Sequence, residues 1–251
     1  PPPPPPQHPP IPTRRSSYLF TETEVEGGTA VAGTISVLTN DSEPDTTDLP
    51  LEFTPPTVAA FDGTTELGTV AFAADGTYTL TLNEDGQIAA NELAAGETLT
   101  LTADYTVSNT PDDGGTPETA TATLTMTITG VNDALVANDD TDTFTETEVE
   151  GGTAVAGTIS VLTNDSEPDT TDLPLTVTAE TVAAFDGTTE LGTVVFATNG
   201  TYTLALNAAG QAAANELAAG ETLTLTADYT VSNTPDDGGT PETATATLTM
   251  T

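Results

Sequence analysis

The stretch Thr129-Gly-Val-Asn-Asp-Ala-Leu-Val-Ala-Asn-Asp-Asp-Thr-Asp142 joins two nearly identical halves of the chain. The motif Thr-Glu-Thr-Glu-Val-Glu-Gly-Gly occurs at residues 21–28 and again at 145–152, a shift of 124 positions. Residues 21–127 and 145–251 differ at 11 of 107 positions, with no insertion or deletion. The halves are therefore two copies of one unit, and residues 129–142 form the joint between two predicted domains.

Each half has a hydrophobic pattern with a period of two residues, as expected for a β-strand with one buried face. Apolar residues alternate with threonine along residues 77–82, 98–107 and 119–129. Antiparallel sheets with one solvated side carry this pattern, and β-branched threonine suits the wet face. With about seven such runs per half, separated by turn signals, the sequence predicts an immunoglobulin-like β-sandwich. The predicted fold class is all-β: two tandem immunoglobulin-like antiparallel β-sandwiches joined by a short acidic linker.

Two local signals interrupt the strands. Asp75-Gly76 and its counterpart Asn199-Gly200 predict tight hairpins, with positive φ supplied by both residues of each dipeptide. The alanine-rich stretch 86–96 closes with glycine and predicts a helix of one or two turns.

The predicted boundaries follow from the repeat and from a change in composition. Residues 1–12 are a proline-rich run, and residues 12–19 resemble a translated sequencing adapter. We therefore expect residues 1–19 to be a disordered, non-native tail. Residues 20–130 form repeat 1, residues 131–143 a calcium-binding linker, and residues 144–251 repeat 2. Thr251 matches Thr127 in mid-strand, so we expect repeat 2 to be truncated and the chain to be a fragment of a longer protein.

The charge is the most unusual property of the sequence. The sequence has 39 acidic residues and only two basic ones, Arg14 and Arg15, and no Lys, Arg or His follows Arg15. Carboxylates after residue 15 can therefore be balanced only by water, N–H and O–H groups, or dissolved cations. Nucleic acid and anionic lipid need a basic surface and are excluded as partners. Divalent cations are the partners that such a chain favours.

Composition also excludes several classes of chemistry. The chain has no cysteine, which rules out disulfides and thiolate metal sites. It has no apolar run of 18 residues, so we expect no membrane insertion. Without His, Lys, Cys or Arg after residue 15, a carboxylate pair is the only catalytic chemistry left, and no spacing singles out such a pair. We therefore predict that the protein is not an enzyme.

Several motifs together resemble the VCBS repeat family. They are Gly76-Thr-Tyr-Thr-Leu80, Leu93-Ala-Ala-Gly-Glu-Thr-Leu99, Asp104-Tyr-Thr-Val-Ser108 and residues 121–133. Residues 38–45 and 136–140 are similar to cadherin-like tandem repeats. The resemblance covers nearly all of residues 20–251. It implies long, calcium-binding, secreted or cell-surface bacterial proteins, many of them giant adhesins exported through a type I pathway.

The sequence departs from that family pattern at two positions. Asn109 stands where a second aspartate is usual, which is expected to weaken a metal ligand. Leu135 stands where proline is usual after Asn-Asp-Ala, which is expected to loosen the joint.

Two kinds of acidic stretch are candidate calcium sites, because calcium takes six to eight oxygen ligands from carboxylates, carbonyls and water. The first kind has acids at alternate positions after a strand, and the second is the joint; Glu26, Glu150, Asp104 and Asp228 are candidate completing ligands. Magnesium is a poorer fit, because it demands octahedral geometry. Solvated acidic turns and a flexible acidic linker are the alternatives that need no metal. The predicted metal ligands are Glu26, Asp41, Glu43, Asp45, Asp104, Asn132, Asp133, Asn138, Asp139, Asp140, Asp142, Glu150, Asp165, Glu167, Asp169 and Asp228.

The function predicted from these observations is a structural extender: repeats of a large bacterial adhesin, made rigid by Ca²⁺ at the joints. Its partners would be calcium ions and neighbouring repeats, with surface glycans reached through domains outside residues 1–251. The first alternative is a module that binds glycan or protein directly through its loops. The second is halophilic adaptation, in which the acids serve solubility and would be scattered over all surfaces.

Overall fold

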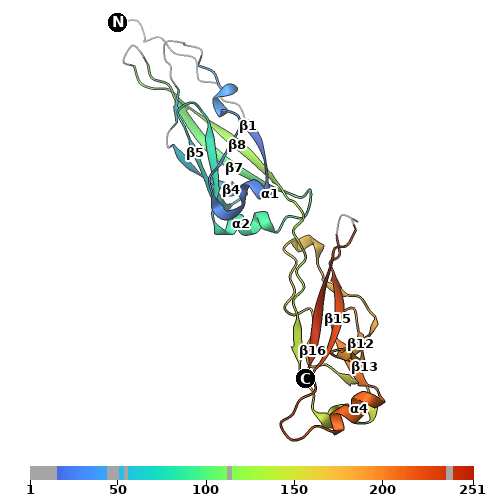
Figure 1. Ribbon diagram of the computed structural model, residues 1–251. Helices are drawn as coiled ribbons and strands as arrows, with labels where there is room; N and C mark the ends of the chain where they lie inside the picture. The colour runs from blue at the N-terminus through green and yellow to red at the C-terminus, as the bar shows by residue number, and fades with distance from the viewer. Residues whose placement is uncertain (1–15, 44–50, 54–55, 112–114, 236–239) are drawn as a thin grey trace, which may run out of the picture. The chain divides into compact units, whose positions relative to one another are not determined.

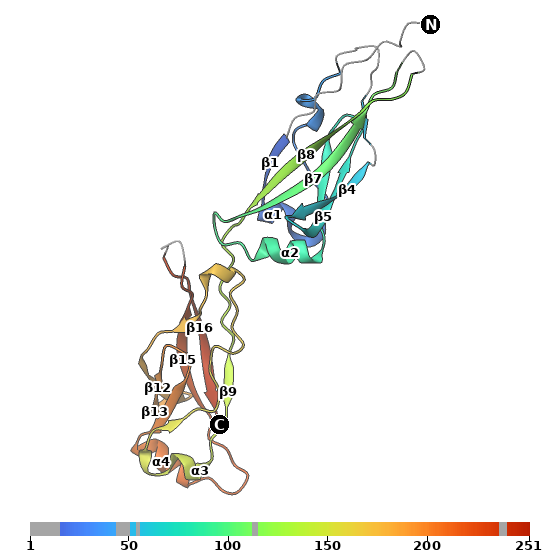
Figure 2. The same cartoon turned by 180° about the vertical axis from the view of Figure 1, so that it is seen from behind.

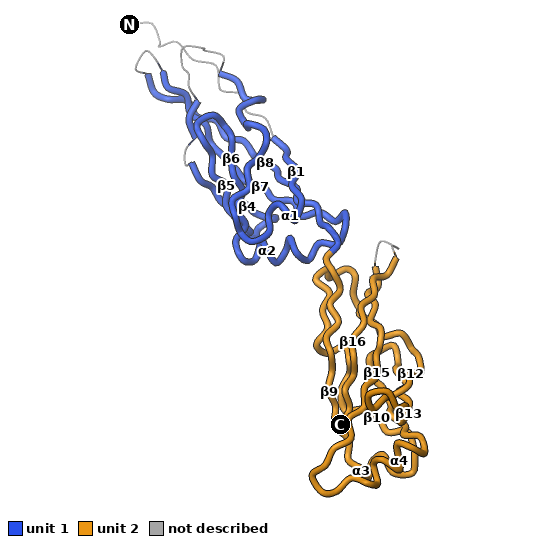
Figure 3. The backbone as a smooth tube through the Cα atoms, viewed as in Figure 1, with its two compact units in different colours: residues 1–132 blue, residues 133–251 orange. Residues whose placement is uncertain are grey.

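The computed structural model divides the chain into two compact units, residues 1–132 and 133–251 (Figure 3). It describes residues 16–43, 51–53, 56–111, 115–235 and 240–251. Each unit is a β-sandwich built on one eight-stranded sheet that wraps around a single hydrophobic core (Figure 1). The predicted pair of tandem β-sandwiches is therefore confirmed.

Unit 1 has the strand order β1-β8-β7-β4-β5-β6-β2, with β3 pairing β7. Its elements are β1 (Ser16–Thr21), α1 (Glu22–Val25), the 3-10 helix η1 (Glu26–Gly28), β2 (Val31–Ala32), the 3-10 helix η2 (Val37–Thr39), β3 (Glu52–Phe53), β4 (Thr57–Asp62), β5 (Thr65–Phe72), β6 (Tyr78–Leu82), α2 (Glu84–Asn91), β7 (Thr98–Ser108) and β8 (Thr119–Thr129).

Unit 2 repeats this arrangement in the order β10-β14-β13-β12-β15-β16-β9, with β11 pairing β15. Its elements are β9 (Asp140–Asp142), α3 (Glu146–Val149), η3 (Glu150–Gly152), β10 (Val155–Ala156), η4 (Thr170–Asp172), β11 (Thr176–Val177), β12 (Thr181–Asp186), β13 (Thr189–Phe196), β14 (Tyr202–Leu206), α4 (Ala208–Asn215), β15 (Leu225–Ser232) and β16 (Thr243–Met250). Helices α3 and α4 lie side by side at one end of this unit (Figure 2).

The period-two pattern places its apolar residues in the core. Along β7 and β8 the apolar side chains are buried or partly buried, and the threonines between them are more exposed. These two strands pair antiparallel over their whole length, from Thr98 opposite Thr129 to Ser108 opposite Thr119. Strands β7 and β8 have 11 residues each, and β15 pairs with β16 in the same antiparallel way in unit 2.

Strand β1 lies parallel to β8, with Phe20 opposite Ile128. Residues 16–19 belong to this strand, although composition placed them in the excluded tail. The strand forms because Phe20 is buried in the core and the edge of β8 offers backbone partners. Residues 1–15 of the predicted tail lie outside the described part of the chain. In unit 2, β9 pairs β16 in the same parallel sense.

The hairpin between β5 and β6 turns where the sequence predicts, but by a different mechanism. Gly76 has a φ of 79°, whereas no described residue other than glycine has positive φ. The Asp75 carboxylate instead accepts hydrogen bonds from the N–H and hydroxyl of Thr77. Asn199 accepts the same two bonds from Thr201 through its amide oxygen. The change from Asp to Asn is neutral because both side chains offer that oxygen, not because both tolerate positive φ.

Helix α2 begins two residues before the predicted range and ends at Asn91. Asn83 sets its start, because its side-chain oxygen accepts the N–H of Gly86 at 2.8 Å. Gly86 faces the sheet, and a Cβ at this position would lie 2.0 Å from the Leu67 carbonyl oxygen. The close approach of α2 to β5 therefore requires glycine.

The repeated Thr-Glu-Thr-Glu-Val-Glu-Gly-Gly motif is explained by local hydrogen bonding. Thr21 and Glu24 form a capping box at the start of α1, in which the Thr21 N–H donates to the Glu24 carboxylate at 2.8 Å. Thr145 and Glu148 repeat this contact at the start of α3. Among the described residues, none of the helices has the length and apolar character needed to span a lipid bilayer.

Replacing Gly86 by alanine should destabilise unit 1 by about 2–4 kcal/mol, because the backbone of α2 or β5 must move to admit the methyl group. Urea unfolding followed by NMR signals of each unit measures the loss. Asp85→Ala is the matched control and should change stability by less than about 0.5 kcal/mol, since unit 2 carries Ala209 at the same helix position. Equal effects of the two substitutions would contradict the packing argument.

Candidate metal centre

Five carboxylates gather at the end of unit 2 where β15 stops and β16 begins. They come from three segments, because Val136 and Ser166 exchange backbone hydrogen bonds and bring residues 133–138 beside the stretch that leads to η4. We call this group the end cluster; it consists of Asp133, Glu167, Asp169, Asp172 and Glu242.

Asp169 is the most buried member of the end cluster, with no exposed surface. One carboxylate oxygen accepts the Asp133 N–H at 3.0 Å. The other oxygen, Oδ1, is buried and has no hydrogen-bond partner. Burial, together with the negative charges of Asp133, Asp172 and Glu242, raises the pKa of Asp169 to about 6. At neutral pH the carboxylate is therefore ionised at a free-energy cost.

Glu167 and Asp172 are also buried, with 8% and 5% of their surface exposed. Both accept hydrogen bonds from the Asn233 amide, at 2.9 and 3.3 Å. Burial raises the pKa of Glu167, and the charges of Asp169 and Asp172 add to the shift. One amide group therefore donates to two carboxylates, and the Asp169 N–H donates to the Glu167 carboxylate at 3.4 Å.

Asn109 and its counterpart Asn233 are structural donors. The Asn233 side-chain oxygen accepts the Glu242 N–H at 2.8 Å while its amide group donates to Glu167. Asn109 makes the same pair of contacts, with the Glu118 N–H and the Glu43 carboxylate. An aspartate here would lose the donor and add another negative charge. Asn109 therefore holds the neighbouring acid in place.

The end cluster offers the donor chemistry of a hard-cation site, although no three of its carboxylates bring oxygens within 4.8 Å of one another. All of its charged atoms are carboxylate oxygens, and no basic residue follows Arg15 in the sequence. Burying an ionised carboxylate without a partner is costly, and a cation is the compensation that this composition leaves. Asp169, Glu167 and Asp172 are the residues that would hold it, with Asp133 and Glu242 beside them. Calcium accepts such irregular oxygen sets more readily than magnesium does.

A second acidic group of unit 2 surrounds the hydroxyl of Tyr229. The hydroxyl donates to the buried Asp140 carboxylate at 2.6 Å. Asp165 lies close by; one of its oxygens accepts the Asn138 N–H at 2.8 Å, and the other is buried without a hydrogen-bond partner. Burial raises the pKa values of Asp140 and Asp165, and that of the Tyr229 phenol rises well above its usual value from burial and from Asp140. Asp139 accepts the Thr247 N–H at 2.8 Å, so this aspartate holds β16.

Both oxygens of the Asp142 carboxylate accept hydrogen bonds. Its oxygens accept the Tyr202 hydroxyl at 2.6 Å, the Thr158 N–H at 2.7 Å and the Thr158 hydroxyl at 2.6 Å. Burial alone would raise the pKa of Asp142, but the bonds from Thr158, Tyr202 and Thr143 outweigh it and lower the pKa below its usual value. Such a site needs no cation.

In unit 1, Glu22 and Glu26 lie at the end where β8 finishes. Their carboxylate oxygens lie within 4.8 Å of one another, and Glu22 is fully buried whereas Glu26 is exposed. Glu22 accepts the Val131 N–H at 2.9 Å. The counterparts in unit 2, Glu146 and Glu150, are both exposed.

Two of the three acids predicted as metal ligands after η2 in unit 1, Asp41 and Glu43, lie in the described part of the chain. Asp41 accepts the Tyr105 hydroxyl at 3.1 Å, and Glu43 accepts the Asn109 amide. Asp45, the counterpart of Asp169, lies outside the described residues. The pKa of Tyr105 rises well above its usual value because of burial and the charge of Asp41.

Two predicted ligands lie away from these groups. Asp104 and Asp228 are exposed in mid-strand, where they accept the hydroxyls of Thr123 at 2.7 Å and Thr247 at 2.9 Å across the sheet. Asn132 is exposed at the end of unit 1. Leu135, expected to loosen the joint, is 8% exposed and packs into the core of unit 2. Because Leu135 is anchored in the core, proline is not needed to restrict the chain at this position.

Sequence reasoning missed four residues of these groups: Glu22, Asp172, Glu242 and Tyr229. Glu22 belongs to the capping-box motif, and nothing in the sequence of that motif distinguishes this buried acid from its neighbours. Asp172 and Glu242 lie beside loops and gave no spacing signal. Tyr229 follows Asp228 in an alternating strand, and its inward position alone could have pointed to a polar partner for its hydroxyl.

No protein-family model matches this sequence. No curated protein matches it either. Solved structures similar to the chain include Drosophila N-cadherin EC1-4, at 14% identity and a TM-score of 0.43 over 97% of this chain and 49% of that one. Protocadherin Gamma B7 domains 1-4 match at 12% identity and 0.39, over 97% and 49%. Human Protocadherin-24 EC1-2 matches at 15% and 0.39, over 94% of both chains. The chain spans about half the length of the first two. Because the TM-scores are below 0.5, these similarities say nothing about function. The proposed function is based on the geometry of each unit.

Replacing Tyr202 by phenylalanine should destabilise unit 2 by about 1–3 kcal/mol, because buried Asp142 loses a charge-assisted hydrogen bond. The repeat supplies the control. Tyr78, the counterpart in unit 1, has a buried hydroxyl without a hydrogen-bond partner, so Tyr78→Phe should be neutral or slightly stabilising there. Native-state hydrogen exchange resolved by NMR separates the two units, and a loss of equal size in both would contradict this assignment.

The raised pKa of Asp169 predicts the pH dependence of the metal-free protein. Since the folded-state pKa of about 6 exceeds the usual 3.8, the folded state binds the proton more tightly, and this contribution to stability is lost as pH rises. Between pH 4 and 7 in metal-free buffer, the wild type should lose about 2 kcal/mol more unfolding free energy than Asp169→Asn. Parallel pH profiles of the two proteins would show that Asp169 titrates normally.

Proposed function

We propose that the two units are extender repeats of a secreted or cell-surface protein, in which Ca²⁺ bound at the end cluster makes the joint rigid. The observation that carries this proposal is Asp169, an acid with no exposed surface whose Oδ1 has no hydrogen-bond partner, set among four other carboxylates. A chain without basic residues beyond Arg15 can neutralise such a group only with a cation or a proton.

The connection between the units supports a role at the joint. The Val131 N–H donates to Glu22 in unit 1, and the Asp133 N–H donates to Asp169 in unit 2. Consecutive Cα atoms lie 3.8 Å apart, so Val131 and Asp133 are at most about 7.6 Å apart.

The finer assignment follows from the resemblance to VCBS repeats. We propose that the parent is a large bacterial adhesin exported through a type I pathway, and that its surface or glycan target is bound by other domains. A role in catalysis is not part of this proposal. Direct glycan binding by these repeats gains little support, because Phe185 is the single aromatic residue among the large hydrophobic side chains found exposed in the described ranges.

The group around Tyr229 is a second place where this proposal puts a cation. Asp140 and Asp165 are acids of raised pKa, and the backbone oxygen of Asn138 lies 3.0 Å from the same tyrosine hydroxyl. In unit 1, Ser16 stands where unit 2 has Asp140. We therefore propose that any ion at this position belongs to unit 2.

Asp169→Asn tests the proposal in both directions. Calcium affinity measured by titration calorimetry should fall at least about tenfold, because a charged ligand is lost. In metal-free buffer at pH 7 the variant should be more stable than the wild type, since an unbalanced buried charge is removed. In saturating calcium it should be the less stable protein. Asp228→Asn, which changes an exposed acid in mid-strand, should leave both properties unchanged.

Small-angle scattering tests the mechanical part of the proposal. Calcium should narrow the distribution of distances between the units and raise the melting temperature of the wild type, whereas Asp169→Asn should need at least about tenfold more calcium for both. Identical dimensions and melting temperatures in calcium and in chelator would remove the extender role.

A further inference from the structure

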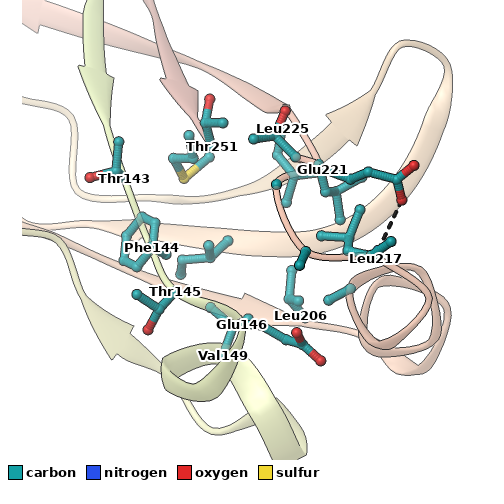
Figure 4. A pocket seen from close by; sticks show the side chains of 18 residues that line it. Thr143, Phe144, Thr145, Glu146, Val149, Leu206, Leu217, Glu221, Leu225 and Thr251 are labelled. Atoms are coloured by element: carbon teal, nitrogen blue, oxygen red, sulfur yellow. Dashed lines mark hydrogen bonds between the residues drawn. The ribbon is translucent and has the colours of Figure 1, made fainter.

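The turn between β13 and β14 carries Asn199-Gly200, the single place in the sequence where asparagine precedes glycine. Asn199 is exposed, and its side-chain nitrogen Nδ2 has no hydrogen-bond partner among the described residues. The apolar cavity of unit 2, about 610 Å³, is lined by other segments, including Phe144 and Leu217, and the turn lies outside it (Figure 4). Water therefore reaches the Asn199 amide directly, and the calcium proposal gives this turn no role.

The reaction open to such a dipeptide is attack of the Gly200 backbone nitrogen on the side-chain carbonyl carbon Cγ of Asn199. Glycine permits this attack because it has no Cβ to block the approach and because its backbone rotates freely. In this turn Gly200 has a φ of 81°, and a Cβ on it would lie 2.4 Å from Ser160 Oγ. The turn therefore requires glycine, the residue that hinders the attack least.

Thr201 supplies the donors that this reaction needs. Its N–H and its hydroxyl donate to Asn199 Oδ1 at 3.2 and 2.7 Å. That oxygen takes up negative charge when the Gly200 nitrogen adds to Cγ, and donors already directed at it stabilise the developing charge. One contact opposes the reaction, because the Gly200 N–H donates to the Ala197 carbonyl at 2.9 Å. Breaking one such hydrogen bond slows the attack about tenfold at most and does not prevent it.

Unit 1 shows the turn that the product would form. Asp75 stands at the equivalent position and accepts the Thr77 N–H at 3.0 Å and the Thr77 hydroxyl at 2.6 Å. These bonds from the side chain and the backbone of Thr77 lower the pKa of Asp75, so its carboxylate is ionised at neutral pH. Gly76 and Gly200 have φ values of 79° and 81°, and the N–H of each makes the same 2.9 Å bond across its turn. Aspartate therefore fits this turn without rearrangement.

We propose that Asn199 is a site of spontaneous deamidation, which converts the turn of unit 2 into the aspartate turn of unit 1. The Gly200 nitrogen forms a bond to Cγ, the bond from Cγ to Nδ2 breaks, and ammonia leaves with the proton that Gly200 gives up through water. A five-membered succinimide ring results. Water then adds to Cγ and the ring opens, which returns a proton to the Gly200 nitrogen and leaves aspartate.

The overall reaction consumes one water molecule and releases one ammonia, so it needs no cofactor. Opening of the ring at the backbone carbonyl carbon would instead give isoaspartate, which has one more carbon atom in the main chain. That extra atom would disturb the bonds from Thr201 and across the turn, so aspartate is the favoured product. The proposal does not depend on the calcium sites or on the extender role.

Incubation of the full 251-residue chain in mildly alkaline buffer, followed by peptide mass mapping, tests the proposal. The fragment with Asn199 should gain the mass that replaces an amide NH₂ by a hydroxyl, with release of an equal amount of ammonia. Fragments with the other asparagines should stay unchanged. The rate should rise with hydroxide concentration, because the Gly200 N–H must lose its proton. The NMR spectrum of the converted protein should match that of Asn199→Asp.

A free peptide and two variants of Thr201 complete the test. Acetyl-Thr-Asn-Gly-Thr-Tyr-amide is the unfolded reference and should convert faster than the protein by about tenfold at most. Thr201→Val, at an exposed position, loses the hydroxyl donor and should convert about three- to tenfold more slowly than the wild type. Thr201→Ser keeps both donors and should convert at the wild-type rate.

Three results would overturn the proposal. The first is a folded chain that keeps Asn199 long after the free peptide has converted fully. The second is isoaspartate as the main product. The third is conversion of Thr201→Val as fast as the wild type, which would show that the turn does not assist the reaction.

Discussion

The rest of the structure depends on the burial of carboxylates in a chain that has no basic side chain after Arg15 to pair with them. Asp169 shows this most clearly, since it has no exposed surface and keeps Oδ1 without a donor. Ordinary buried acids are balanced by arginine or lysine, or by a full set of hydrogen bonds. Here the amides of Asn233 and of the backbone supply only part of that set. A proton or a cation at this end of unit 2 would neutralise the charge that remains.

The rest of unit 2 holds these acids in place. The β15–β16 hairpin fixes Asn233 and Glu242 at its open end, and the backbone bridge between Val136 and Ser166 brings the first residues of the unit alongside. Not every acid in these loops needs a cation. Asp142 takes its hydrogen bonds from tyrosine and threonine, and its pKa falls below the usual value. An acid in these loops keeps an unbalanced charge when few hydrogen-bond donors reach it, however many other carboxylates lie nearby.

The sequence was sufficient for the architecture, because alternation of apolar residues with threonine reports strand faces directly and the 124-residue repeat locates the units. It was insufficient for the site. Glu22 and Asp172 look like their exposed neighbours, and only tertiary packing buries them. Asp104 was selected because it protrudes from a strand, yet it lies on the open face of the sheet beside Thr123. The spacing of acids in the sequence shows where they are concentrated. Burial and the number of hydrogen-bond donors decide which of these acids keep an unbalanced negative charge.

Two almost identical repeats also make an internal comparison possible, since the same residues appear in two environments. Tyr78 and Tyr202, or Glu22 and Glu146, differ only in what surrounds them. The central claim concerns one atom, Asp169 Oδ1, and a crystal structure grown in calcium tests it most directly. We expect anomalous density about 2.3–2.6 Å from that oxygen, shared with Glu167 or Asp172. Crystals at neutral pH and millimolar calcium that show Asp169 with no ion beside it would contradict the account.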